Sequence, residues 1–289
     1  METKPPITIS QQVELLKSRG CIIDDEFECS EFLSRVNYYR LSAYFLPFLD
    51  SKTDSYVTGT NFSRICRIYN FDQILRMLLL SVIEDIEVFV RTQVAYYCAH
   101  KYDPLGYEDA INFNNRHDHA KFIAAIESEV KRNENVLFVK HHIKKYNGKL
   151  PIWVAVELFS FGTLSRFFSD LKLPDQKILA KEMFGLDNRI IRSWLHCGTG
   201  LRNICAHYGR LYFRELGALP LTPKKFTTPF DRSLFSSIVM LMHMYPDIEK
   251  WNLIFTYPLE HVFSKYENVL DTKHMGFPDN WREILAQKK

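Results

Sequence analysis

Three residue types that can act together on a phosphate ester occur in one short segment of the chain: Arg202, Asn203 and His207. Asn203 and His207 are four positions apart and would share one face of a helix, and the long stem of Arg202 can curl to the same edge. Histidine takes and gives protons near neutral pH, and a planar guanidinium binds a phosphate through two hydrogen bonds. Asparagine can orient the histidine or contact the phosphate or a ribose hydroxyl.

This set of side chains suits the cleavage of RNA, because the 2′-hydroxyl of RNA supplies the nucleophile and no metal is required. The product would be a 2′,3′-cyclic phosphate. An arginine and a histidine at this spacing are also common on helices without any catalytic role, so the spacing alone favours a structural interpretation. The motif lies within residues 188–214, which include five arginines and no Asp or Glu. This stretch is either a solvated face or a basic surface that supports the catalytic interpretation.

The composition excludes several classes of protein. The chain has 289 residues, of which 46% are hydrophobic and 25% charged, as is typical of a globular protein with a sizeable core. No apolar run approaches the roughly 20 residues that span a bilayer, and no secretory signal is evident, so we expect a cytoplasmic protein. The six cysteines form no C-x-x-C pair and are expected to be small buried residues.

The spacing of apolar residues predicts an all-α fold. The strongest helical pattern covers residues 62–100, and a break is expected near Asn70. Further helical segments are expected at 10–18, 30–36, 38–48, 120–139, 151–161, 164–171, 177–184, within 189–214, at 230–244 and at 251–255, ending before Pro258. We expect residues 1–60 to form an N-terminal helical element and residues 61–289 to form a larger helical domain.

A series of short motifs appears in order along the chain. They are Arg19-Gly20, Asn37 to Tyr44, Phe48, Tyr69, Phe71-Asp72, Leu75-Arg76, Glu84, Glu87, Arg91, Pro151-Ile152-Trp153, Glu157 and Arg202-Asn203 through His207. Together they resemble the Abi-like family of bacterial abortive-infection proteins. The last motif also resembles the R-x4-6-H signature of HEPN (higher eukaryotes and prokaryotes nucleotide-binding) domains. The resemblance covers residues 10–215 and weakens beyond them.

The resemblance implies an all-α HEPN-type helical bundle and a metal-independent endoribonuclease without a cofactor. Such a protein acts in phage defence or as the toxin of a toxin–antitoxin pair, whose antitoxin is an RNA or a protein. The implied substrate is RNA, and the implied assembly is a homodimer that brings two motifs together. Within the motif we assign His207 as the acid/base, Arg202 as the group that stabilises charge on the phosphate, and Asn203 as the orienting residue.

Three residues of the long predicted helix, Glu84, Glu87 and Arg91, lie on one helical face. They form either an ordinary ion pair or a face that meets the Arg202–His207 helix and orients its side chains, and the first interpretation is favoured. Arg91 is also a candidate for RNA contact.

Two further groups are candidates for RNA contact. Tyr38, Tyr39 and Arg40 combine aromatic rings with a cation, which can stack bases and bind phosphate, although tyrosines in a helix more often belong to a core. Tyr208 and Arg210 flank the motif and are candidates for holding RNA.

Two rival functions stay open on the sequence alone. The first is an RNA-binding protein without catalysis that scaffolds a partner RNA, such as a small non-coding RNA. The second is a regulatory protein that accepts a nucleotide, for instance on Tyr208.

Overall fold

The computed structural model describes residues 5–286, in which helices are almost the only regular secondary structure, so the predicted all-α class is confirmed. The α-helices are α1 (Ile9–Ser18), α2 (Glu26–Arg35), α3 (Tyr38–Phe45), α4 (Phe62–Tyr102), α5 (His119–Arg132), α6 (Leu137–Tyr146), α7 (Ile152–Ala155), α8 (Phe161–Asp170), α9 (Leu173–Phe184), α10 (Asn188–Ala206), α11 (Leu234–Met244), α12 (Ile248–Trp251), α13 (Tyr257–Tyr266) and α14 (Trp281–Leu285). Short turns of helix are η1 (Leu46–Phe48), η2 (Gly106–Glu108), η3 (Ala110–Asn112), η4 (Val156–Leu158), η5 (Asn252–Thr256, π-type) and η6 (Thr272–Met275). Two-residue strands β1 (Leu49–Asp50) and β2 (Ser55–Tyr56) pair antiparallel.

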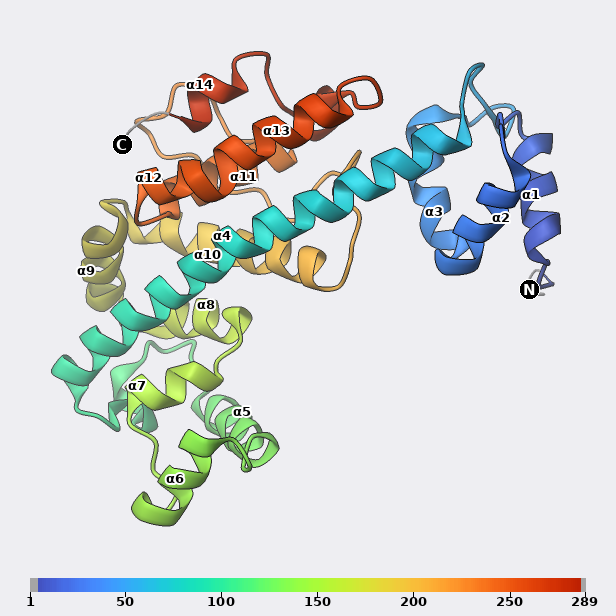
Figure 1. The fold of residues 1–289 in the computed structure, drawn as a ribbon. Helices are drawn as coiled ribbons and strands as arrows, with labels where there is room; N and C mark the ends of the chain where they lie inside the picture. The colour runs from blue at the N-terminus through green and yellow to red at the C-terminus, as the bar shows by residue number, and fades with distance from the viewer. Residues whose placement is uncertain (1–4, 287–289) are drawn as a thin grey trace.

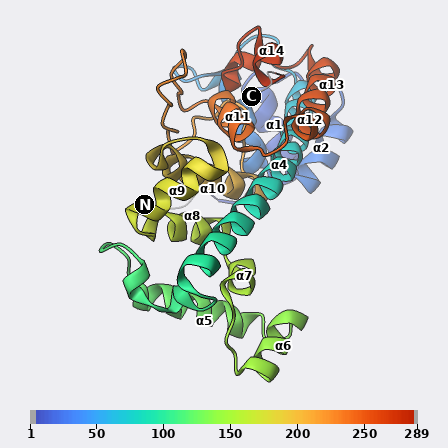
Figure 2. The ribbon, with the colours of Figure 1, turned by 90° about the vertical axis from the view of Figure 1, so that its left-hand side faces the viewer.

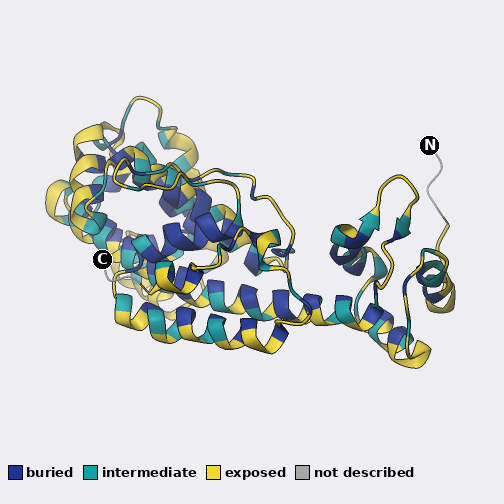
Figure 3. Cartoon of the chain, turned by 90° about the horizontal axis from the view of Figure 1, so that it is seen from above, coloured by how far each residue is buried: buried dark blue, intermediate teal, exposed yellow. Residues whose placement is uncertain are grey.

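The long helix α4 organises the molecule. Its 41 residues extend about 60 Å, with α1–α3 gathered around its N-terminal end and the other helices along the rest of it (Figure 1). Buried and exposed residues alternate along it at helical spacing (Figure 3). The break expected near Asn70 is absent, because Phe71, Leu75 and Leu79 continue the buried stripe through this point.

Helix α10 packs against α4, α8, α9 and α11. It runs unbroken through Gly198 and Gly200. At Gly198 a Cβ atom would lie only 3.2 Å from Cε1 of Phe161, so this glycine permits the close approach of α10 to the start of α8. The helices α11–α14 complete the core on the other side of α10 (Figure 2).

Several predicted helix boundaries are wrong, for local reasons. The predicted helix 120–139 is divided into α5 and α6, because the Asn133 backbone and side chain both bind the Glu129 carbonyl and close α5. The interruption expected at residues 162 and 163 lies earlier, where Ser160 caps α8 by accepting a hydrogen bond from the Thr163 amide at 3.1 Å. The end expected before Pro258 is also wrong, since this proline occupies the first turn of α13, where it is tolerated.

The boundary predicted at residue 60 falls just before the start of α4, which belongs to the predicted domain 61–289 and also contacts α3 of the N-terminal element. The division into two parts stays a prediction. Among residues 5–286, no helix combines the length and the apolar character that a membrane span requires.

Candidate active site

The C-terminal end of α10 fixes the backbone of His207. The amide of Tyr208 binds the Cys205 carbonyl at 3.2 Å and the amide of Gly209 binds the Ile204 carbonyl at 2.7 Å, which is the Schellman arrangement of a helix end. His207 is the capping residue, and its amide binds the Asn203 carbonyl at 3.0 Å. Asn203 and His207 are both exposed on consecutive turns, so the structure brings these two predicted residues together.

Tyr208 occupies the position in this helix end that glycine normally fills. Its φ of 60° lies in the left-handed region, while its side chain is 69% exposed. The following Gly209 is required by space, because a Cβ atom there would lie 2.9 Å from Cγ2 and 3.0 Å from the carbonyl oxygen of Ile204. A strained and exposed aromatic residue directly after His207 is typical of a functional site.

Arg202 lies on a different side of α10 from Asn203. Its half-buried side chain lines a hollow between α10 and α4 together with Glu84, Glu87 and Arg91. Asn203 lines a separate hollow, because consecutive residues point about 100° apart around a helix. The shared edge expected for Arg202 and Asn203 is therefore not observed within one chain.

The residues Glu87 and Arg91 form the expected ion pair, with both side chains mostly buried. Arg91 also donates to the Phe159 carbonyl at 2.6 Å and lies 3.6 Å from a carboxylate oxygen of Glu157. Its guanidinium is therefore committed to protein contacts. The Glu87–Arg91 ion pair itself lies in the hollow that Arg202 lines. These residues can therefore form an ion pair and also face the Arg202–His207 helix.

A buried carboxylate that the site prediction missed anchors the segment after His207. Asp72 in α4 is fully buried and lies 2.6 Å from the Arg76 guanidinium. It also accepts hydrogen bonds from the backbone amides of Leu211 and Tyr212 and from the Tyr44 hydroxyl. Burial raises the pKa of the Asp72 carboxyl, and these hydrogen bonds and the nearby guanidinium oppose that rise.

Two arginines considered for RNA contact instead join α3 to the segment after α10. Arg40 donates to the Tyr208 carbonyl, and Arg210 donates to the Ala43 carbonyl at 2.9 Å. Tyr38 is half-buried, and its hydroxyl lies 3.4 Å from the Arg19 guanidinium. Of Tyr38, Tyr39 and Arg40, only Tyr39 is exposed.

The sequence model of the Abi-like protein family matches residues 31–213, which is more than half of the chain. The chain belongs to the Abi-like family. Membership implies a role in abortive infection, a form of phage defence. The match begins within α2 and ends after α10. It therefore includes α4, α10 and the segment that Asp72 binds. No curated protein and no solved structure gives a match.

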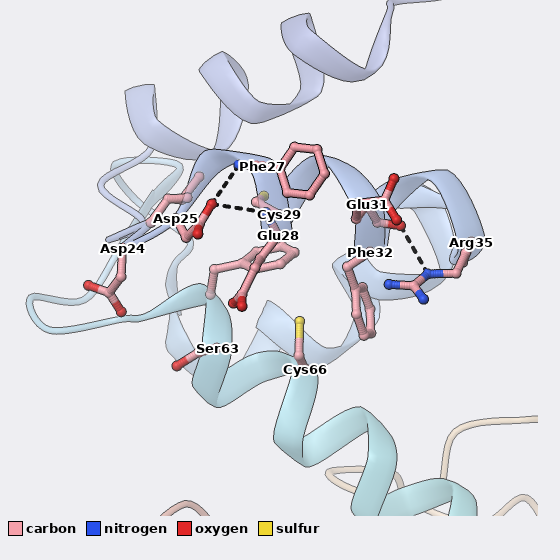
Figure 4. Close-up of a pocket in the computed structure, with 12 residues that line it drawn as sticks. Asp24, Asp25, Phe27, Glu28, Cys29, Glu31, Phe32, Arg35, Ser63 and Cys66 are labelled. Atoms are coloured by element: carbon pink, nitrogen blue, oxygen red, sulfur yellow. Dashed lines mark hydrogen bonds between the residues drawn. The ribbon is translucent and has the colours of Figure 1, made fainter.

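Another pocket of the Abi-like chain lies between α2 and the start of α4 (Figure 4). Its lining includes four acidic residues, Asp24, Asp25, Glu28 and Glu31. The Asp25 carboxylate accepts hydrogen bonds from the amides of the first turn of α2, which accounts for its position as a helix cap. An acidic lining repels a polyanion, so this pocket is a poor match for RNA.

The chemistry available at the end of α10 is that of His207, Asn203 and Arg202. Cys205 is not a candidate nucleophile, because burial raises the pKa of its thiol to about 12. All six cysteines are free. Five of them are buried as predicted, whereas Cys66 is only partly buried. In the part of the chain that the structure describes, no group of three or more His, Cys, Asp or Glu residues is arranged to hold a metal ion.

Proposed function

We propose that this Abi-like protein is a metal-independent endoribonuclease of the HEPN type, which acts in the cytoplasm as a phage-defence effector or as the toxin of a toxin–antitoxin pair. The observation that carries the proposal is the helix end at His207. An exposed histidine follows an exposed asparagine there, and a strained residue, Tyr208, holds the turn.

The reaction assigns one role to each residue. His207 takes the proton of the ribose 2′-hydroxyl, whose oxygen forms a bond to the adjacent phosphorus while the bond from phosphorus to the 5′-oxygen breaks. The leaving 5′-oxygen needs a proton from a second acid. Arg202 stabilises the charge that develops on the phosphate oxygens, and Asn203 orients the imidazole or the ribose.

A second copy of the chain supplies what one chain lacks. Within one chain the hollows of Arg202 and Asn203 are separate, and one His207 serves either as the base or as the acid in a given step. In a homodimer with two α10 ends side by side, one His207 acts as the base and the other as the acid. The proposal therefore includes a homodimer with a composite site.

Overexpression in bacteria tests the proposal. We expect the wild-type protein to arrest growth and to generate new RNA ends, and we expect His207→Ala and Arg202→Ala to abolish both effects while folding normally. His261→Ala is the matched control, because His261 is an exposed histidine on α13. If His207→Ala arrests growth as the wild type does, His207 is not required for the effect and the proposal is wrong. Arrest by the wild type without new RNA ends would favour a protein that binds RNA without cleaving it.

A further inference from the structure

Two adjoining hollows follow α10 on the side of Asn203. The first lies between α8 and α10 and has a volume of about 780 Å³; the second lies between α10 and the segment 214–219. They share Ser193, His196 and Thr199, so they form one continuous trough. The trough extends from Arg166 on α8 to Asn203, one helical turn before His207.

The charged residues that line this trough are all positive. Arg166, Arg189 and Arg192 line its first part, Arg214 lines its second part, and no Asp or Glu is among its lining residues. Arg189 pairs through Nε with Asp187, which lies outside the lining. Arg166 and Arg192 are exposed, and neither side chain forms a hydrogen bond or an ion pair with another residue in the range 5–286.

The lining also indicates how a ligand would be held. It contains no Phe, Tyr or Trp that could stack on a base. The unpaired guanidinium groups of Arg166 and Arg192 can bind phosphate through paired hydrogen bonds, and no carboxylate in the lining opposes this attraction. Such a surface suits a chain of phosphates and is indifferent to base sequence.

We infer that the trough binds the sugar–phosphate backbone of a single RNA strand on one side of the bond that is cut. The inference rests on the proposed function and extends it, since it names the surface that leads the substrate to His207. Arg192 precedes His207 by 15 residues of α10, or about 22 Å along the helix axis, which spans several nucleotides. Arg166 and Arg192 are the main phosphate contacts, and the hold does not depend on sequence.

A basic stretch at residues 140–149, away from the trough, offers a direct comparison. Its cations include Lys140 and Lys144, which are exposed on α6. This helix lies at the edge of the molecule, apart from α8 and α10 (Figures 1 and 2). The double variant Lys140→Gln/Lys144→Gln removes the same charge as Arg166→Gln/Arg192→Gln and leaves the trough intact.

The experiment measures binding of a fluorescent single-stranded oligoribonucleotide of mixed sequence by full-length protein carrying His207→Ala, so that cleavage does not interfere. We expect Arg166→Gln/Arg192→Gln to raise the dissociation constant about tenfold or more. The slope of log K against log salt should fall by about 1.4, because each contact to a single strand contributes roughly 0.7. The lysine pair should change neither value by a comparable amount.

Unchanged affinity of the arginine variant, or an equal loss in the lysine variant, would overturn the inference. Circular dichroism and thermal unfolding confirm that both variants fold, which is expected because all four side chains are exposed. The same protein distinguishes this inference from the proposed function. If wild-type protein binds RNA through the trough but does not cleave it, the nuclease proposal is wrong and the inference about RNA binding is supported.

Discussion

His207 owes its position to backbone geometry more than to side-chain contacts. The helix end places it between the exposed Asn203 and the left-handed Tyr208, and Gly209 lets the chain turn back against Ile204. The R-x4-H spacing does not predict this turn. The usual sequence signal is also missing, because Tyr208 stands where a helix end normally has glycine. The prediction of the three catalytic candidates therefore rested on residue types and on the family resemblance.

Replacing Tyr208 by glycine should stabilise the fold. The left-handed conformation costs a non-glycine residue about 1 kcal/mol, and the exposed ring has few contacts to lose, so the unfolding free energy should rise by about that amount. Chemical denaturation measures the change. A lower unfolding free energy would mean that contacts of the ring outweigh the backbone strain.

Two glycines near the site should respond to alanine in opposite directions. Gly209→Ala should destabilise the protein by about 1–3 kcal/mol, because the new methyl would overlap Ile204. Gly200→Ala is the matched control in α10, where a Cβ meets nothing within 4 Å, and it should stabilise by up to about 1 kcal/mol. Equal effects of the two substitutions on the melting temperature would contradict the close-packed turn.

Helix α4 acts as the element on which the site is assembled. Its long apolar stripe made it predictable, whereas further partners of the buried Asp72 lie elsewhere in the chain. Asp72 and Arg76 are spaced as a local pair, but the carboxylate also binds amides 139 and 140 positions away. Such pairings depend on tertiary contacts, so the residue spacing of α4 could not reveal them. The sequence also could not show that Arg166 and Arg192, which lie on different helices, line one hollow.

Asp72→Asn tests this element. The substitution leaves the Arg76 guanidinium buried without a counter-ion, so the unfolding free energy should fall by about 3–5 kcal/mol. Asp54→Asn is the control at an exposed pair with Arg19, and it should cost about 0–1 kcal/mol. If denaturant titration gives similar losses for both, Asp72 does not anchor the segment after His207.

At the scale of the whole molecule, the N-terminal helix α3 is physically connected to the end of α10 that carries the candidate catalytic residues. Arg40 and Arg210 link α3 to the segment after His207. The N-terminal element is thus placed to affect the site, a relation that the separate predicted ranges 1–60 and 61–289 did not convey. The proposed homodimer belongs to this scale as well, and sedimentation of the purified protein should give twice the mass of the 34.1 kDa chain.

Cleavage of RNA by the purified dimer in the presence of EDTA tests the central claim most directly. We expect wild-type protein and His261→Ala to cut RNA and to leave 2′,3′-cyclic phosphate ends. His207→Ala should be slower by at least about a hundredfold, which is the usual contribution of an acid/base group. Intact RNA after incubation with folded, dimeric wild-type protein free of a co-purified inhibitor, or equal cleavage by His207→Ala, would contradict the account.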